Sequence, residues 1–212
     1  MSFYQIIYKL FARPVKAIWR VSSEGSENIP EGGAIVVANH TAMMDVLVLE
    51  AASPRQIRFM AKKELFKIPL LSSLITALGA YPVDRGGADI KSLKRTFSMI
   101  NDGDLIGIFP QGTRVPYADP RESEIKGGIG MIAYHAKATI VPAFIDAEKG
   151  KTTAFRKNHV IFGKPISFEE LGFEGGGRGE YQRVANLIFD KVCELKYGAK
   201  ADAPHNEEKE NG

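Results

Sequence analysis

Short runs rich in Val, Ile and Phe alternate with longer amphipathic stretches along most of the chain. The short runs have the length and composition of buried strands and cover residues 34–38, 57–61, 105–109, 139–145 and 160–162. The longer stretches place apolar residues at helical spacing and predict helices over residues 41–52, 65–78, 89–100, 130–137 and 181–196. This alternation indicates an α/β fold in which a sheet carries helices on both faces.

The first 21 residues have a different pattern, with an apolar face opposite a basic one. At about 100° per residue, the basic face collects Lys9, Arg13, Lys16 and Arg20. Such a helix is typical of an anionic membrane surface, with Trp19 and Tyr8 at the level of the lipid headgroups. Pro14 is expected to kink the helix or to split it in two. The pattern also suits an ordinary amphipathic helix that packs on its own domain.

The rest of the chain is most simply one domain, because 212 residues with 44% hydrophobic content can bury a full core. We expect a membrane-association segment at 1–21, a folded domain at 22–198 and a disordered polar tail at 199–212. The Gly-rich segment 174–180 is predicted to be a flexible connector. The apolar run 68–80 is too short to span a bilayer and predicts a core element, or the wall of a tunnel for an acyl chain.

Charge and cysteine content exclude several classes of protein. A net charge of +3 is too small to predict nucleic-acid binding. The single cysteine, Cys193, excludes an internal disulfide and a cysteine-based metal cluster, and it lies in a helical pattern as a packing residue. The histidines lack the H-x3-H and H-E-x-x-H spacings, so no metal site is predicted.

The first candidate for chemistry is the pair His40 and Asp45, where the first predicted strand ends and a helix begins. Two residues five apart within a regular helix diverge by about 140° and would not meet. A histidine at the helix entrance can instead fold back towards the carboxylate, which would fix its tautomer and leave one ring nitrogen free as a base. The alternative is a histidine that only caps the helix.

The pair belongs to the first of four motifs that lie between Asn39 and Phe144: NHTAMMD, AYPVDR, FPQGTR and IVPAF. In order and spacing they resemble the four blocks of the 1-acylglycerol-3-phosphate acyltransferase family, and AKKELFKIP from Ala61 resembles its segment between the first two blocks. The resemblance implies a glycerol-phosphate acyltransferase fold, a single α/β domain with a central mixed sheet flanked by helices. It also implies membrane association, a His40–Asp45 catalytic dyad, and Arg85 and Arg114 as phosphate ligands.

The residues themselves agree with these assignments. Arg85 and Arg114 follow strand-like runs, so both are expected near His40 at one edge of the sheet, and guanidinium groups suit phosphate oxygens. Lys62 is a further candidate for the phosphate, although it could equally be a solvated surface lysine. Gly112 permits close approach of the backbone to a ligand. The set expected to position the substrate is Gln111, Gly112, Thr113 and Pro142.

The expected reaction is direct transfer of a fatty acyl group from acyl-ACP or acyl-CoA to the sn-2 hydroxyl of lysophosphatidate, without an acyl-enzyme and without a cofactor. The expected location is the cytoplasmic face of the cell membrane, as a peripheral or monotopic protein. Several alternatives stay open: another lysolipid or glycerol 3-phosphate as acceptor, a lipid hydrolase that activates water, or a non-catalytic lipid-binding module. One position departs from the family pattern, because Gln111 stands where the third block usually has Glu.

Overall fold

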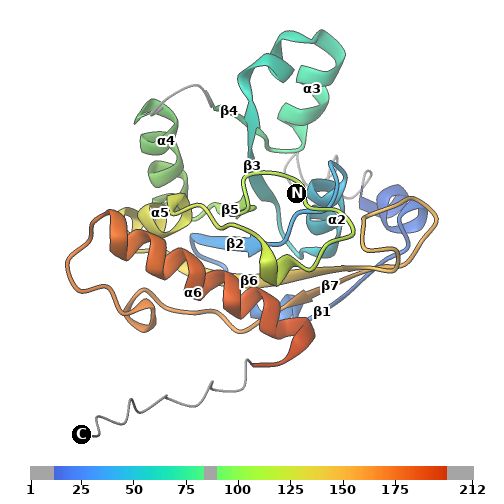
Figure 1. Ribbon diagram of the computed structural model, residues 1–212. Coiled ribbons are helices and arrows are strands. Elements are labelled where there is room, and N and C mark those ends of the chain that lie inside the picture. The colour runs from blue at the N-terminus through green and yellow to red at the C-terminus, as the bar shows by residue number, and fades with distance from the viewer. Residues whose placement is uncertain (1–11, 84–89, 200–212) are drawn as a thin grey trace, which may run out of the picture.

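The computed structural model describes residues 12–83 and 90–199, and its centre is a seven-stranded sheet (Figure 1). Neighbouring strands are parallel except for β6 and β7, which are antiparallel. The predicted mixed sheet is therefore confirmed. Across the sheet the order is β1 (Val21–Glu24), β7 (Asn158–Phe162), β6 (Thr139–Ala147), β2 (Ala34–Ala38), β5 (Leu105–Ile108), β3 (Ile57–Lys62) and β4 (Tyr81–Val83).

Helices connect these strands and cover both faces of the sheet (Figure 1). The α-helices are α2 (Asp45–Ala52), α3 (Pro69–Ala77), α4 (Ile90–Asn101), α5 (Gly128–Ala136) and α6 (Arg178–Tyr197), and residues 12–18 are also helical. Short 3-10 helices are η1 (Ser26–Asn28), η2 (Lys63–Lys67), η3 (Pro120–Glu122) and η4 (Glu169–Leu171).

The sheet separates two hydrophobic cores, because successive side chains of a strand point to opposite faces. Ile35 and Val37 of β2 belong to the core under α4, α5 and α6, whereas Val36 belongs to the core under α2. Cys193 is buried in the first core, as its helical pattern predicted. Both faces of β2 are fully buried, which explains its continuous apolar sequence.

The sequence pattern did not predict two of the strands, and it placed the start of one helix too early. β1 and β4 contain four and three residues, and each lies at an edge of the sheet, so neither shows a buried apolar run. α2 begins at Asp45 rather than at residue 41. The Asp45 carboxylate accepts hydrogen bonds from the amides of Thr41 and Ala42, and these bonds hold residues 41–44 as a turn.

The prediction that residues 68–80 form a core element is wrong for α3. Among the α3 residues whose side chains the structure describes, none belongs to either core, and Leu70 is 89% exposed. Among the described residues, none of this segment lines the cavity beside His40, so a tunnel wall here is not supported. The prediction of a flexible connector at 174–180 is also wrong in part, because α6 begins at Arg178.

The chain ends are described only in part. Residues 1–11 and 200–212, which carry most of the predicted amphipathic segment and the polar tail, lie outside the described residues. Within residues 12–20, Arg13, Lys16 and Arg20 are exposed, whereas Trp19 packs against the core under α2. This packing differs from the predicted place of Trp19 at the lipid headgroups. None of the helices within residues 12–83 and 90–199 combines the length and the hydrophobicity of a membrane-spanning segment.

Candidate active site

The imidazole of His40 and the carboxylate of Asp45 meet at the carboxyl end of β2. The distance from His40 Nδ1 to Asp45 Oδ2 is 2.9 Å. His40 lies two residues beyond the last strand residue, outside the helix, so its ring can turn back towards the first residue of α2. Because Nδ1 donates to the carboxylate, Nε2 is the nitrogen that can accept a proton.

Asp45 is fully buried and receives hydrogen bonds on both carboxylate oxygens. Oδ2 accepts from His40 and from two backbone amides, while Oδ1 accepts from the hydroxyls of Thr41 and Thr152. A buried carboxylate costs much free energy unless such donors surround it. The five donors therefore compensate the burial of the Asp45 carboxylate and fix its orientation.

The His40 ring is held from its other side by the segment that follows β5. It stacks on the ring of Phe109, with centroids 4.2 Å apart and planes 15° apart. Its backbone amide donates to Gln111 Oε1 at 2.7 Å, and its carbonyl accepts from the Val115 amide at 2.8 Å. With only 17% of its side chain exposed, His40 is oriented before any substrate arrives.

A cavity of about 300 Å³ opens in front of this ring. Five of the predicted site residues line it: His40, Lys62, Gly112, Thr113 and Arg114. They reach it because β2, β5 and β3 are parallel neighbours whose carboxyl ends share one edge of the sheet. Lys62 and Arg114 make the mouth of the cavity cationic, whereas Val46, Phe59 and Phe109 make its wall apolar.

Three predicted residues lie elsewhere. Arg85 falls outside the described residues, two positions after the end of β4. Pro142 lies within β6, paired with Val37 of β2, and does not line the cavity in front of His40. Gln111 is only 3% exposed and supports the site from behind, since its Nε2 also donates to Ser123 Oγ at 2.8 Å.

Gly112 has a positive φ of 68°, and its amide donates to the Phe109 carbonyl at 3.1 Å. Glycine adopts this backbone conformation without the steric penalty that other residues carry. The amide is already used within the turn, so Gly112 shapes the cavity wall and does not supply a free donor for an oxyanion.

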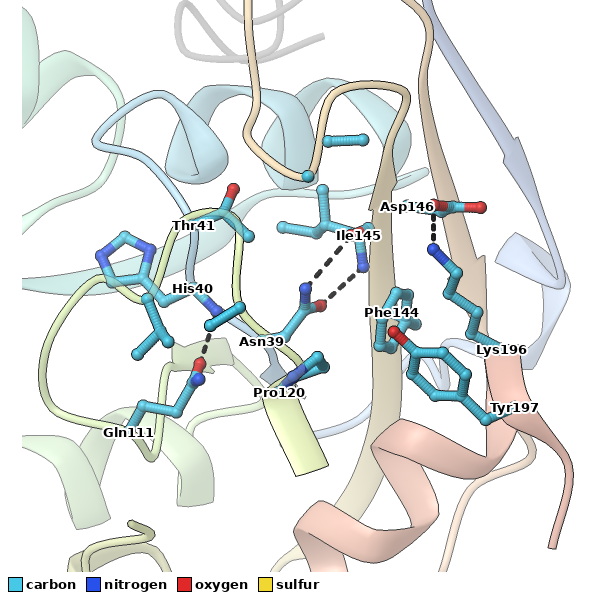
Figure 2. Close-up of a pocket in the computed structure, with 14 residues that line it drawn as sticks. Asn39, His40, Thr41, Gln111, Pro120, Phe144, Ile145, Asp146, Lys196 and Tyr197 are labelled. Carbon is cyan, nitrogen blue, oxygen red and sulfur yellow. Dashed lines mark hydrogen bonds and ion pairs between the residues drawn. The ribbon is translucent and has the colours of Figure 1, made fainter. Parts of the chain in front are cut away.

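A second, smaller hollow of about 50 Å³ lies between the residues that follow β2 and strand β6 (Figure 2). Figure 2 shows the Asn39 amide paired with the backbone of Ile145 on β6 and the Gln111 side chain directed at the His40 backbone. The Asn39 bonds measure 3.1 Å to the carbonyl and 2.8 Å from the amide. These contacts tie the end of β2 to its two neighbouring strands.

Sequence reasoning missed Phe109, Ser123 and Thr152 as parts of this site. Phe109 belongs to the FPQGTR motif and could have been found there. Thr152 carries no local signal, because it lies in the connection between β6 and β7, 107 residues after Asp45. Within the described residues, no group of three or more His, Cys, Asp or Glu could hold a metal ion.

The arrangement is a histidine base with a buried carboxylate partner, beside a cationic cavity mouth and an apolar wall. The model of the Acyltransferase family matches residues 20–146. A 1-acyl-sn-glycerol-3-phosphate acyltransferase of Bacillus subtilis (strain 168) is 33% identical over 168 residues, covering 76% of this chain and 82% of that protein. The chain belongs to the 1-acyl-sn-glycerol-3-phosphate acyltransferase family. The family predicted from the four motifs is thus confirmed.

Two further similarities extend over more of the chain. A 1-acyl-sn-glycerol-3-phosphate acyltransferase of Streptococcus pneumoniae is 29% identical, over 93% of this chain and 75% of that protein. The crystal structure of the 1-acyl-sn-glycerophosphate acyltransferase PlsC from Thermotoga maritima matches with a TM-score of 0.64 and 25% identity, over 93% of this chain and 85% of that one. The acyltransferase fold therefore includes the elements outside the four motifs.

Proposed function

We propose that this acyltransferase moves a fatty acyl group from acyl-ACP or acyl-CoA to the sn-2 hydroxyl of 1-acylglycerol 3-phosphate and so forms phosphatidic acid. The observation that carries the proposal is the His40–Asp45 bond of 2.9 Å at a cavity whose mouth holds Lys62 and Arg114. Membership of the family and the names of its relatives support the choice of lysophosphatidate as acceptor.

In the proposed mechanism His40 Nε2 takes the proton of the sn-2 hydroxyl while the hydroxyl oxygen attacks the thioester carbonyl carbon. The C–O bond forms, the carbonyl electrons move to oxygen, and Asp45 stabilises the imidazolium. Collapse of the tetrahedral intermediate breaks the C–S bond, and the thiolate takes the proton back from Nε2. A positioned base of this kind contributes roughly 10²–10⁴-fold, so alignment of hydroxyl and thioester supplies much of the remainder.

Charge at the cavity mouth orients the acceptor. The phosphomonoester carries negative charge that Arg114 can bind with two donors and Lys62 with a compact ammonium. Arg85 is assigned to the same phosphate on the strength of the AYPVDR motif alone. The apolar wall formed by Val46 and Phe59 then suits the glycerol-linked acyl chain. The reaction needs no cofactor, because the thioester is itself a substrate.

The lipid acceptor implies contact with a membrane surface. We assign the enzyme to the cytoplasmic face of the cell membrane as a peripheral or monotopic protein, in contact with the carrier protein or coenzyme on the aqueous side. The exposed basic side chains of Arg13 and Lys16 support an attraction to anionic lipid.

A panel assay tests the proposed reaction. Purified enzyme would be offered lysophosphatidate, glycerol 3-phosphate and lysophosphatidylcholine, each with acyl-ACP and with acyl-CoA. We expect phosphatidic acid from lysophosphatidate and little product from the other two acceptors. Preferred acylation of another acceptor would reassign the substrate, and release of free fatty acid without any acceptor would identify a hydrolase.

A further inference from the structure

The segment formed by η2 and α3 exposes large apolar side chains that neither core needs. Leu65 is 37% exposed, Ile68 51% and Leu70 89%. α3 packs on η2, and the Ser72 amide donates to the Ile68 carbonyl at 2.7 Å, so these side chains belong to one ordered unit. Clustered exposed apolar side chains of this size mark a surface that a membrane or another molecule covers.

The same segment carries an excess of positive charge. Lys63 and Lys67 of η2 are exposed, as is Lys62 directly before it, against one exposed carboxylate, Glu64. Long lysine side chains can keep their ammonium groups at the headgroup level while their methylene stems lie along apolar surface. An apolar tip flanked by lysines is complementary to an anionic bilayer.

This surface also begins at the mouth of the active-site cavity. Lys62 is the last residue of β3 and lines the cavity, and Lys63 is the first residue of η2. Figure 1 shows α3 beyond the end of β3, away from α5 and α6. A membrane that touches α3 would therefore face the cavity that we assign to the lipid acceptor.

We propose that η2 and α3 form a membrane-docking surface, separate from residues 1–21, that seats the cavity mouth on an anionic bilayer. The proposal rests on the proposed function, because only a lipid substrate gives the cavity a reason to face the membrane. Leu70 and Ile68 enter the apolar boundary of the bilayer, while Lys63 and Lys67 lie among the headgroups.

A second copy of the chain is the competing occupant of this surface, and charge argues against it. A symmetric dimer would place the same lysines of both copies near one another, and like charges would repel. Three exposed apolar side chains also fall short of the hydrophobic area that stable dimers bury. An anionic bilayer can accommodate both the lysines and the exposed apolar side chains without this repulsion.

The test is co-sedimentation of the full chain with phosphatidylcholine vesicles, with and without phosphatidylglycerol. The double variant Ile68→Gln/Leu70→Gln should bind vesicles that contain phosphatidylglycerol at least about tenfold more weakly, since each buried Leu or Ile contributes several-fold to partitioning. Lys67→Gln should weaken binding only when phosphatidylglycerol is present. Ser73→Gln changes an exposed side chain of the same helix without removing apolar surface and should bind as the parent does.

Activity towards a short-chain, water-soluble lysophosphatidate separates this proposal from the proposed function. The double variant should keep its turnover with that acceptor and lose it with lysophosphatidate in vesicles. If the double variant binds vesicles as well as the parent does, the docking proposal is wrong. It is also wrong if light scattering gives a lower mass for the variant than for the parent, because the surface would then hold two copies of the chain together. A parent enzyme inactive towards the soluble acceptor would refute the proposed reaction, while the binding data would still decide the role of α3.

Discussion

At the scale of single residues, His40 is held by four contacts, and each of them leaves Nε2 available for the reaction. The His40→Ala change removes the base, and the space left by the ring opens into the cavity that the ring already lines. Transfer should fall by roughly 10²–10⁴-fold or more, whereas the melting temperature should change little. Turnover assays alongside thermal unfolding measure both quantities. Near-parental turnover in this variant would refute the mechanism.

Asp45→Asn should also be severe, but it should leave more residual activity than His40→Ala. The amide cannot stabilise the imidazolium, although it can still contact Nδ1. Asp45 is buried among five hydrogen-bond donors. The NH2 group of an asparagine would face some of these donors without an acceptor between them, so this variant should unfold at a lower temperature. Comparison of kcat with the fraction folded separates the two effects.

Thr152 is a positioning residue, because it acts on the reaction only through Asp45. Thr152→Val keeps the shape of the side chain but removes the donor to Oδ1, leaving the Thr41 hydroxyl at 3.2 Å. We expect kcat to fall about tenfold, which corresponds to about 1.4 kcal/mol, with KM for lysophosphatidate nearly unchanged. Thr152→Ser restores the hydroxyl and should restore kcat. Equal losses in both variants would indicate a packing role instead.

We expect Gln111 to make this enzyme a working variant of the usual motif. Its Oε1 accepts from the His40 amide, and a glutamate could accept the same bond and also one from the Ser123 hydroxyl. Gln111→Glu should therefore stay within about tenfold of the parent in kcat and mainly raise KM for lysophosphatidate, since it adds negative charge near the phosphate site. Steady-state kinetics at saturating thioester test this. An inactive parent with an active Gln111→Glu variant would favour the lipid-binding module.

Residue identity was predictable where the motif and the local geometry agreed. The five-residue spacing of His40 and Asp45 at a strand end predicted their contact, and the structure has it at 2.9 Å. The opposite holds for Thr152, because its contact depends on how β6 and β7 fold back onto the end of β2. Short-range patterns contain no information about such a contact.

At the scale of elements, the start of α6 shows how one carboxylate organises a Gly-rich turn. Glu180 accepts hydrogen bonds from the amides of Glu174, Gly176 and Gly175, and these bonds lower its pKa from the ordinary 4.5. A lowered folded-state pKa means that the stabilisation is present above pH 4.5 and disappears as the pH falls through the folded-state pKa. The segment is therefore a built turn and not a flexible connector.

This gives a pH-dependent prediction for Glu180→Gln. The variant should melt at a lower temperature than the parent at neutral pH, and the difference should close as the pH falls below 4.5. Glu174→Gln removes a carboxylate from the same turn while leaving the three amide bonds to Glu180 in place, so it serves as the control. A difference that stays constant down to acidic pH would contradict the role of the Glu180 carboxylate in this turn.

Elements were predictable when their burial produced a pattern. β2 was predicted to the residue because both of its faces are buried. α4, α5 and α6 were predicted with their ends displaced by one to three residues, because one face of each packs in the core. α3 was assigned to the core because it is apolar, and composition alone cannot distinguish an apolar helix inside a core from one at the surface. Edge strands β1 and β4 pair through backbone atoms and leave little trace in side-chain type.

At the scale of the whole molecule, two separate surfaces are assigned to the membrane. Removal of residues 1–11 deletes most of the predicted amphipathic segment but keeps Trp19, whose carbonyl accepts from Asn158 at 2.6 Å. The truncated chain should bind anionic vesicles more weakly, but not lose binding, because η2 and α3 remain. Higher salt should weaken both forms, since lysine and arginine attract the headgroups. If the truncated protein sediments like the full chain, the N-terminal segment does not contribute to the membrane contact.

The bonds that hold the dyad also join distant parts of the chain. The contacts of His40 with Gln111, of Asn39 with Ile145 and of Asp45 with Thr152 span 71, 106 and 107 residues. We expect such contacts to form late in folding, because each one closes a long loop of chain. Recovery of turnover during refolding should therefore lag behind recovery of helical circular dichroism, and a nascent chain should gain activity only after the β6–β7 connection has been synthesised and has folded onto β2.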